Sequence, residues 1–168
     1  MRMLKLSRIG LVAVLLFACV GCDQVTKVVA RDHITLGHTQ SFLGDTFRLT
    51  HTENPGAFLG MGASLPESAR VVIFQGGVAL LVLGLLWYAL FARRVDDWSV
   101  VGFALLAASG IGNLIDRFLQ DGLVTDFLNL GFGSLRTGIF NVADIVGVIG
   151  FAILIVKGRT AQSAPLER

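Results

Sequence analysis

Two aspartates, Asp126 and Asp144, stand in stretches that could bring their carboxyl groups together for acid–base chemistry. Two carboxyl groups that lie close together cannot both ionise cheaply, so they share a proton. One of them can then act as a base towards a water molecule while the other acts as an acid. This is the arrangement of the aspartic proteases, and it indicates hydrolysis by a carboxylate pair.

Further polar side chains lie near this pair at helical spacing. Asn113 precedes Asp116 and Arg117 by three and four residues, and Asn141 precedes Asp144 by three. Residues three or four apart share a side of a helix, so two polar faces can converge. Such ionisable groups are expensive at membrane depth and usually face a bundle interior or a water-filled site.

Each of these residues also has a plainer explanation. Asn141 could be a helix N-cap with Asp144 in the first turn. Asp116 and Arg117 could form a structural ion pair, and Asp126 could be an ordinary carboxylate in an outer loop. Their combination near one membrane face favours a functional site.

The sequence lacks the motifs that other hydrolytic mechanisms require. It contains neither an HExxH zinc motif nor a GxSxG nucleophile elbow, and its three histidines all fall between residues 31 and 70. Cys19 and Cys22 share the first apolar run, so they cannot supply a disulfide framework or a four-ligand zinc site. A serine or metal mechanism is therefore disfavoured.

The composition is that of a membrane protein. Hydrophobic residues make up 54% of the 168 residues, charged residues only 15%, and the mean hydropathy is +0.71. The net charge of +2 comes from scattered basic residues. Without a continuous cationic strip, nucleic acid is not expected as a partner.

Four stretches are long and apolar enough to cross a bilayer as helices: residues 9–29, 71–91, 98–119 and 139–156. Basic residues such as Arg8, Arg93 and Lys157 flank these spans in a pattern that predicts both termini on the cytoplasmic side. Residues 31–70 and 120–138 then face outside, and the polar cluster lies at the outer face. Small residues, among them Ala108 with Gly112 and Gly147 with Gly150, are expected at helix contacts.

Residues 31–70 form the longer outer segment and are predicted to hold a small β element on the membrane surface. Two stretches in it, HITL and TFRLTHTE, alternate between apolar and polar residues, and a turn-forming ENPG follows the second. No internal repeat or second domain is visible.

Five short motifs occur in one order along the chain: DQVTK, ENPGAF, GNLIDRF, GLVTDF and FNVAD. In this order and spacing the sequence resembles the lipoprotein signal peptidases, also called signal peptidase II. The resemblance implies a single integral-membrane peptidase domain over residues 1–168, with four transmembrane helices and a small periplasmic β-cradle. It also implies an enzyme of the bacterial inner membrane, in contact with membrane lipids, that cuts diacylglyceryl-modified prolipoproteins just before the lipidated cysteine and uses no metal or organic cofactor. We expect the protein to be a monomer.

The same resemblance assigns residues to the site. Asp126 of VTDF and Asp144 of NVAD match the catalytic dyad. The residues that match substrate-binding or supporting positions are Asp23, Lys27, Asn54, Gly56, Asn113, Asp116, Arg117 and Asn141. Two other functions stay open at this point: an inactive relative that binds lipoprotein precursors, and a small transporter, which would spread its carboxylates across the membrane depth.

The stretch ACVGCDQVTK, residues 18–27, has two incompatible interpretations. Gly21 and Cys22 fit the last two places of a lipobox, so residues 1–21 could be a removable signal peptide. The lipobox is incomplete, however, because Cys19 stands where an aliphatic residue is expected. Asp23 and Lys27 are four apart on one helix face and can partly neutralise each other. We expect a retained first helix.

Overall fold

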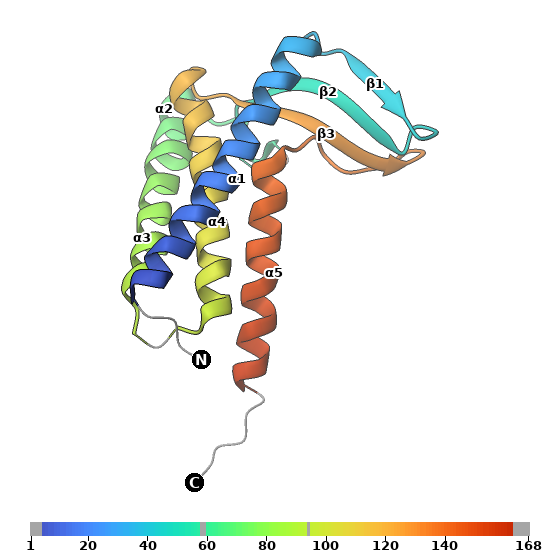
Figure 1. The fold of residues 1–168 in the computed structure, drawn as a ribbon. Coiled ribbons are helices and arrows are strands. Elements are labelled where there is room, and N and C mark those ends of the chain that lie inside the picture. Colours follow the sequence, from blue (N-terminus) through green and yellow to red (C-terminus); the bar gives the residue numbers. More distant parts are fainter. Residues whose placement is uncertain (1–4, 58–59, 94, 163–168) are drawn as a thin grey trace.

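Long apolar runs of the chain form helices that lie side by side in a bundle, with a small sheet at one end (Figure 1). This computed structural model describes residues 5–57, 60–93 and 95–162. The main helices are α1 (Lys5–His33), α3 (Val78–Phe91), α4 (Asp97–Leu119) and α5 (Val142–Gln162). A short helix α2 (Glu67–Arg70) and a π-helical segment η2 (Val71–Gly77) lead directly into α3.

Within the described residues, three helical stretches are long and apolar enough to cross a membrane: Leu6–His33, Glu67–Phe91 and Asp97–Leu119. They coincide with the first three predicted spans, although the first runs on past Val29 to His33 and the second begins earlier, at Glu67. The fourth predicted span, residues 139–156, falls largely within α5. Its passage through the membrane stays a prediction.

Small residues allow α4 and α5 to approach closely, as the sequence predicted. A Cβ atom added to Gly150 would lie 2.8 Å from the carbonyl oxygen of Gly102, and one added to Gly147 would lie 2.6 Å from Oγ of Ser109. On its other sides α4 contributes Val100 and Ala104, both fully buried, to the core between α1 and α3. The helix that carries Asn113 is therefore held from several sides.

The sheet is antiparallel, and its strands come from both outer segments. Its order is β1 (Thr39–Phe42), β2 (Phe47–Asn54), β3 (Val124–Phe132) and β4 (Leu135–Arg136). The predicted β element of residues 31–70 is found as β1 and β2, and residues 120–138, for which no strand was predicted, supply the other two strands. The pairing of β2 with β3 shifts between Leu49 and Thr52, as in a β-bulge.

One of the two predicted strands is also displaced. TFRLTHTE lies mostly in β2, as expected, but HITL does not form a strand: His33 ends α1, and Leu36 makes only an isolated bridge to His51. The first helix continues into this stretch because Ala30 and Ile34 pack on Phe127 of β3. This contact fixes the outer end of α1 against the sheet.

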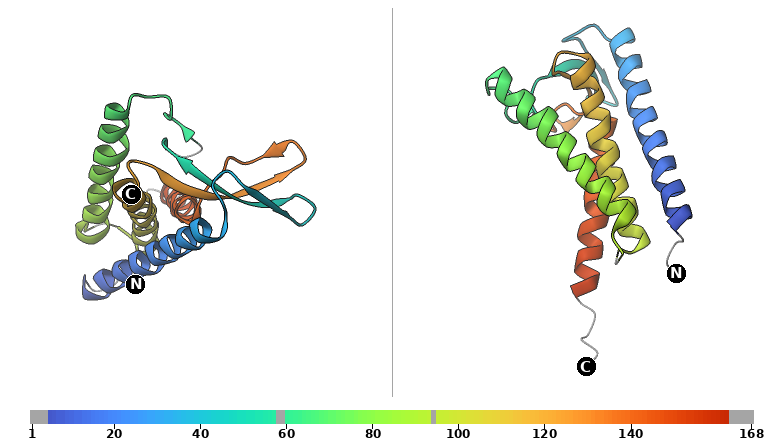
Figure 2. Two further views of the ribbon diagram at one scale, coloured as in Figure 1. Left: turned by 90° about the horizontal axis from the view of Figure 1, so that it is seen from above. Right: turned by 90° about the vertical axis from the view of Figure 1, so that its left-hand side faces the viewer.

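The sheet crosses one end of the bundle and projects sideways beyond it (Figures 1 and 2). The beginning of α1, the connection between α3 and α4, and the end of α5 all lie at the opposite end (Figure 1). β3 follows α4 and precedes α5 in the chain, so its first residues lie where the two helices meet the sheet. The polar residues of the sequence gather there.

Candidate active site

Asp126 lies near the start of β3 and is only 3% exposed. Its Oδ1 accepts a hydrogen bond from Nδ2 of Asn141 at 2.7 Å, and its Oδ2 accepts one from Nδ2 of Asn54 at 2.9 Å. The pKa of Asp126 is raised to about 7. Burial is the main cause and the charge of Asp144 adds to it, while the two amide donors and the charge of Lys27 partly offset the rise. The carboxyl group can therefore hold a proton near neutral pH. Asp126 lies in strand β3, and not in the outer loop that the sequence analysis predicted.

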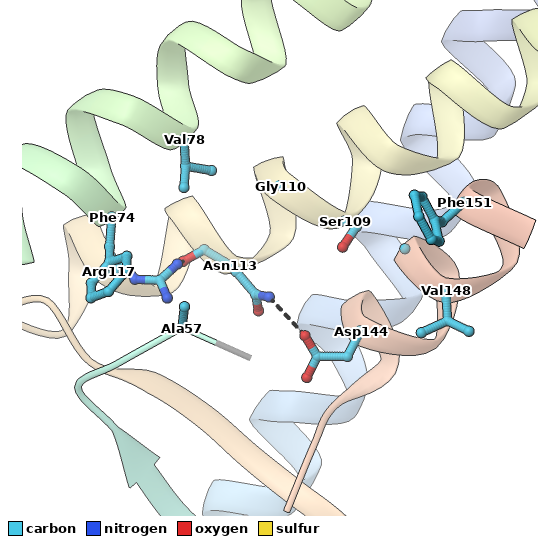
Figure 3. A pocket seen from close by; sticks show the side chains of 11 residues that line it. Ala57, Phe74, Val78, Ser109, Gly110, Asn113, Arg117, Asp144, Val148 and Phe151 are labelled. Atoms are coloured by element: carbon cyan, nitrogen blue, oxygen red, sulfur yellow. Dashed lines mark hydrogen bonds between the residues drawn. The ribbon is translucent and has the colours of Figure 1, made fainter. Parts of the chain in front are cut away.

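Asp144 lies in the first turn of α5 and is half-buried. Its Oδ2 accepts the backbone N–H of Asn141 at 3.1 Å, while its own N–H donates to Oδ1 of Asn141 at 3.0 Å. This reciprocal pair is a capping box, in which an acid in the first turn and the N-cap residue satisfy each other's backbone. Oδ1 of Asp144 also accepts Nδ2 of Asn113 at 3.3 Å (Figure 3).

Asn141 connects the two acids. Its side chain is fully buried, and besides capping α5 it donates through Nδ2 to Asp126 and, at 3.0 Å, to Oδ1 of Asn113. The plain N-cap explanation is thus correct but incomplete. One asparagine fixes a carboxylate on the sheet relative to a carboxylate on a helix.

A buried cluster of charged side chains, Asp23, Lys27 and Asp116, supports this arrangement through a contact with Asn113. Nζ of Lys27 lies 2.8 Å from Oδ2 of Asp23 and 3.0 Å from Oδ2 of Asp116, and all three side chains are 1% exposed or less. Nζ also donates to Oδ1 of Asn113 at 2.9 Å. The predicted neutralisation of Asp23 by Lys27 is therefore found, and Lys27 reaches a residue that contacts Asp144.

The same cluster holds the beginnings of two elements. Oδ1 of Asp23 accepts the backbone N–H of Ala143 in the first turn of α5 at 2.8 Å. Oδ2 of Asp116 accepts the backbone N–H of Thr125 in β3 at 3.0 Å. Each acid therefore satisfies a backbone donor next to one of the two candidate catalytic aspartates, Asp144 and Asp126.

Arg117 does not pair with Asp116, so the explanation of these neighbours as an ion pair was wrong. Its guanidinium donates to the carbonyl oxygen of Gly56 at 2.8 Å and lies 5.7 Å from the centre of the Phe74 ring (Figure 3). The two side chains diverge because Asp116 turns towards Lys27. Arg117 instead holds the ENPG turn and the second helical stretch to α4.

The ENPG turn itself is built around Asn54. Its Oδ1 accepts the N–H of Gly56 at 2.9 Å, and its Nδ2 reaches Asp126. A Cβ atom at Gly56 would lie 2.6 Å from the carbonyl oxygen of Met61, so a side chain does not fit there. The turn thereby places Nδ2 of Asn54 within hydrogen-bond distance of Asp126.

A cavity of about 360 Å³ opens beside Asp144. The charged residues Asp144 and Arg117 and the amide of Asn113 border it, and apart from the hydroxyl of Ser109 the rest of its wall is apolar or glycine (Figure 3). The remaining lining residues are Ala57, Phe74, Val78, Ser109, Gly110, Gly147, Val148 and Phe151.

Asp126 borders a different pocket of about 240 Å³, together with Asn54 and Gly138. Gly138 also lines a third, apolar pocket of about 330 Å³ on the other side of Asp144. The two acids thus face adjoining hollows and not one common cavity, and the asparagine bridge is what joins them. Among the described residues, no group of three or more His, Cys, Asp or Glu side chains is arranged to hold a metal ion.

The sequence profile described as Signal peptidase (SPase) II matches residues 15–159 of this chain. The chain belongs to the signal peptidase II family. A protein named lipoprotein signal peptidase from Streptococcus pneumoniae is 32% identical over 149 residues, which cover 88% of this chain and 91% of that protein. Another of the same name from Syntrophus aciditrophicus is 36% identical over 135 residues, covering 80% and 83%.

Solved structures agree with this membership. One described as a bacterial membrane enzyme, obtained by the in meso method at 2.3 Å resolution, superposes with a TM-score of 0.83 at 26% identity and covers 95% of this chain and 94% of that one. A second, at 1.9 Å resolution, gives a TM-score of 0.75 at 25% identity, with coverage of 89% and 92%. Together with the three apolar helical stretches, family membership makes this chain a multi-pass bacterial membrane protein.

Two residues of this candidate site, Gln24 and Phe74, were not identified from the sequence. Gln24 donates through Nε2 to Asp116 at 3.1 Å and to the carbonyl oxygen of Gly112 at 3.0 Å, and Phe74 stacks beside Arg117. Gln24 had a weak signal, since it is a polar residue next to Asp23 in an otherwise apolar run. No sequence signal distinguished Phe74, because an aromatic residue in an apolar span is not different in kind from a lipid-facing residue.

Proposed function

We propose that this protein is an aspartic endopeptidase that removes signal peptides from diacylglyceryl-modified prolipoproteins and cuts just before the lipidated cysteine. The observation that carries the proposal is the bridge through Asn141, which links Asp126 to Asp144 where the two acids border adjoining pockets. The relatives named lipoprotein signal peptidase supply the substrate class. Family membership identifies a protease, and the two carboxyl groups linked through Asn141 support an aspartic mechanism.

The surroundings of the two acids suggest separate roles. Asp126, with its pKa raised to about 7, holds the proton that an acid must donate. Asp144 lies in the first turn of α5, where the helix dipole favours a negative charge, so it serves as the base. Because the pair is coupled, the proton belongs to both acids together at equilibrium.

The reaction then runs in two steps. Asp144 takes a proton from water as the water oxygen bonds to the scissile carbonyl carbon, and Asp126 gives its proton to the carbonyl oxygen. In the second step the tetrahedral intermediate returns a hydroxyl proton to Asp126, and Asp144 protonates the departing amide nitrogen. The C–N bond breaks, and the products are a carboxylic acid and the amine of the cysteine.

The remaining polar residues of the cavity fit the peptide backbone of the substrate. Arg117 and Asn113 border the cavity of about 360 Å³ with donors, and its apolar wall suits the small and aliphatic residues that precede the cleavage site. The other matched residues, Asp23, Lys27, Asp116, Asn54 and Gly56, take supporting roles through the contacts described above.

In the membrane, we place α5 as the fourth span of a single monomeric domain. Arg8 lies near the start of α1, Arg93 just after α3 and Lys157 near the end of α5. These ends of the three helices lie opposite the sheet (Figure 1), and their basic residues support a cytoplasmic location for that end and for both termini. The sheet end, with the dyad, then faces outwards. At that level the acyl chains of the substrate can stay in the bilayer while the peptide bond meets the acids.

The test is cleavage of a diacylglyceryl-modified precursor by purified full-length protein and its Asp126→Asn and Asp144→Asn variants. Both variants should lose cleavage while keeping the thermal unfolding profile of a folded protein. The matched control is Asp121→Asn, an exposed aspartate in the turn after α4, which should cleave like the original. Full activity in either dyad variant would exclude the mechanism. Precursor binding without any product would support the inactive relative instead.

A further inference from the structure

The cavity of about 360 Å³ beside Asp144 extends along the helix axes. Asp144 and Phe151 both line it from α5, and seven residues of helix span about 10 Å. Ala57, which follows the ENPG turn, lines it close to the sheet, and Ser109 lies farther from Ala57 than Asn113 does (Figure 3). The cavity therefore leads from the level of the acids towards the middle of the bundle.

This direction matches the part of a precursor that precedes the cut. On the proposed function, on which this inference rests, the signal peptide lies in the membrane and the mature protein lies outside. The residues just before the cleaved bond therefore enter the cavity. An extended peptide advances about 3.3 Å per residue, so a length of about 10 Å holds about three residues.

Ser109 carries the polar group that lies deepest along this cavity. It precedes Asn113 by four residues on α4, which places it about 6 Å farther from the sheet. A helical serine or threonine often donates to the carbonyl four residues earlier, as Thr26 does to Cys22 at 2.9 Å. The hydroxyl of Ser109 makes no hydrogen bond to any residue that the structure describes. It is therefore available to a ligand.

A hydroxyl without a partner is costly in these surroundings. The residues that line the cavity beside Ser109 are Gly110, Val148 and Phe151, and none of their side chains can form a hydrogen bond. Polar groups in apolar surroundings are nearly always paired, because an unpaired one loses its hydrogen bonds to water without compensation. A molecule that enters the cavity can supply the missing partner.

Gly147 leaves the space that this hydroxyl occupies. A Cβ atom added to Gly147 would lie 2.6 Å from Oγ of Ser109 and 3.2 Å from its Cβ atom. A side chain at position 147 would therefore displace or cover the hydroxyl. At this level the wall combines little side-chain bulk with one hydroxyl, which suits a small polar side chain of the substrate.

We propose that Ser109 is a specificity-determining residue, and that its hydroxyl pairs with a serine or threonine at the second residue before the cleaved bond. The attacked carbonyl belongs to the residue directly before the cut and lies at the level of Asp144 and Asn113, which contact each other. The next residue inwards lies about 3.3 Å deeper, and a hydrogen bond between two hydroxyls adds about 2.8 Å. Together these lengths match the depth of about 6 Å at which Ser109 lies.

The experiment uses two synthetic precursors that carry a diacylglyceryl-modified cysteine and differ only in the second residue before the cut, which is serine or alanine. Purified full-length protein cleaves both in one reaction, and the ratio of their kcat/KM values is measured. The original protein should prefer serine about 3- to 10-fold, because alanine leaves one hydrogen bond unmade. Ser109→Ala and Ser109→Gly should each bring the ratio close to 1.

Ser68→Ala is the matched control. Ser68 is an exposed serine of α2 that does not line the cavity beside Asp144, so this variant should keep the original ratio. Because each ratio compares two substrates on one protein, a general loss of activity or of folded protein cancels. If Ser109 only separated α4 from α5, its replacement would lower both rates equally.

An unchanged ratio in Ser109→Ala would overturn the proposal, and so would equal cleavage of the two precursors by the original protein. If the original protein cleaves neither precursor, the proposed function fails instead, and binding then decides the role of Ser109. The two precursors compete for Asp144→Asn protein, which does not cleave by the proposed mechanism. Serine should again be preferred about 3- to 10-fold, and adding Ser109→Ala should remove the preference. Equal affinities for the two precursors would overturn the proposal there too.

Discussion

Nδ2 of Asn141 lies 2.7 Å from Oδ1 of Asp126, so the residue that caps α5 also orients a carboxylate on the sheet. Asn141→Ser keeps a capping oxygen for α5 but removes the amide donor. We expect kcat for a diacylglyceryl-modified precursor to fall about 10- to 100-fold, because a hydrogen bond to a charged group contributes about 1.5–3 kcal/mol. Loss of the donor also disfavours the ionised carboxylate, so the pH at which activity declines should move upwards.

Asn141→Ala is the companion of this variant, since it removes both the donor and the cap. It should lower the thermal unfolding temperature further than Asn141→Ser does, by the loss of an N-cap worth about 1 kcal/mol. If Asn141→Ser kept the original kcat and pH profile, the bridge between the acids would have no catalytic role.

The raised pKa of Asp126 predicts a definite pH dependence. Its native-state pKa of about 7 lies above the ordinary value of 3.8, so the folded protein binds more protons than the unfolded chain between those values. Stability should therefore fall as pH rises from about 4 to about 7 and then level off. Asp126→Asn removes this contribution. Unfolding temperatures of the two proteins across pH 4–8 in detergent should diverge in favour of the variant, and parallel curves would contradict the assignment.

Activity should follow the same group. If Asp126 donates a proton to the substrate carbonyl, kcat should decline as pH rises through about 7. At still higher pH kcat should fall to zero, while the fraction of folded protein should stay unchanged over the same interval. A rate that climbs through this range would instead make Asp126 the base.

Among the residues that the structure describes, Lys27 is the only cation within salt-bridge distance of Asp23 and Asp116. Lys27→Met leaves these buried acids without a counter-charge, which should destabilise the protein by about 3–5 kcal/mol. Thermal unfolding of purified protein measures the loss. Combining it with Asp23→Asn and Asp116→Asn removes the uncompensated charges, so the triple variant should recover part of the stability. A triple variant less stable than Lys27→Met would show that hydrogen-bond geometry dominates over charge.

Gly112 tests the close contact between α1 and α4. A Cβ atom there would lie 2.6 Å from Oδ2 of Asp23 and 3.2 Å from Cβ of Ala143. Gly112→Ala should therefore displace Asp23 and destabilise the protein by about 1–3 kcal/mol, as overpacked cores do. Gly84→Ala is the control, because nothing lies within 4 Å of its added Cβ and alanine favours helix. Equal unfolding temperatures for both variants would argue against the tight contact.

The sequence predicted the helices well because membrane depth demands long apolar runs, and these leave little ambiguity. It also predicted that Asn113, Asn141 and Asp144 would converge, since their spacing fixes their sides of two helices. It did not predict that Asp126 lies in a strand. The stretch VTDFLNLGF pairs with β2, which lies far away in the chain, and its first residues are buried on both sides, so alternation is obscured.

The partners of Asp116 and Arg117 show a second limit. Adjacent positions of opposite charge suggested a pair, but neighbours on a helix point about 100° apart. Lys27 on α1 and Gly56 in the ENPG turn decide which way each side chain turns. Such partners come from tertiary packing, and no local pattern contains them.

The bond between Asp23 and the backbone of Ala143 joins positions 120 residues apart. A ribosome must therefore translate the chain beyond Ala143, and α5 must pack beside α1, before this contact can form. Until then the nascent chain lacks the assembled pair of Asp126 and Asp144. The two aspartates can thus come together only after α5 has packed against the other helices.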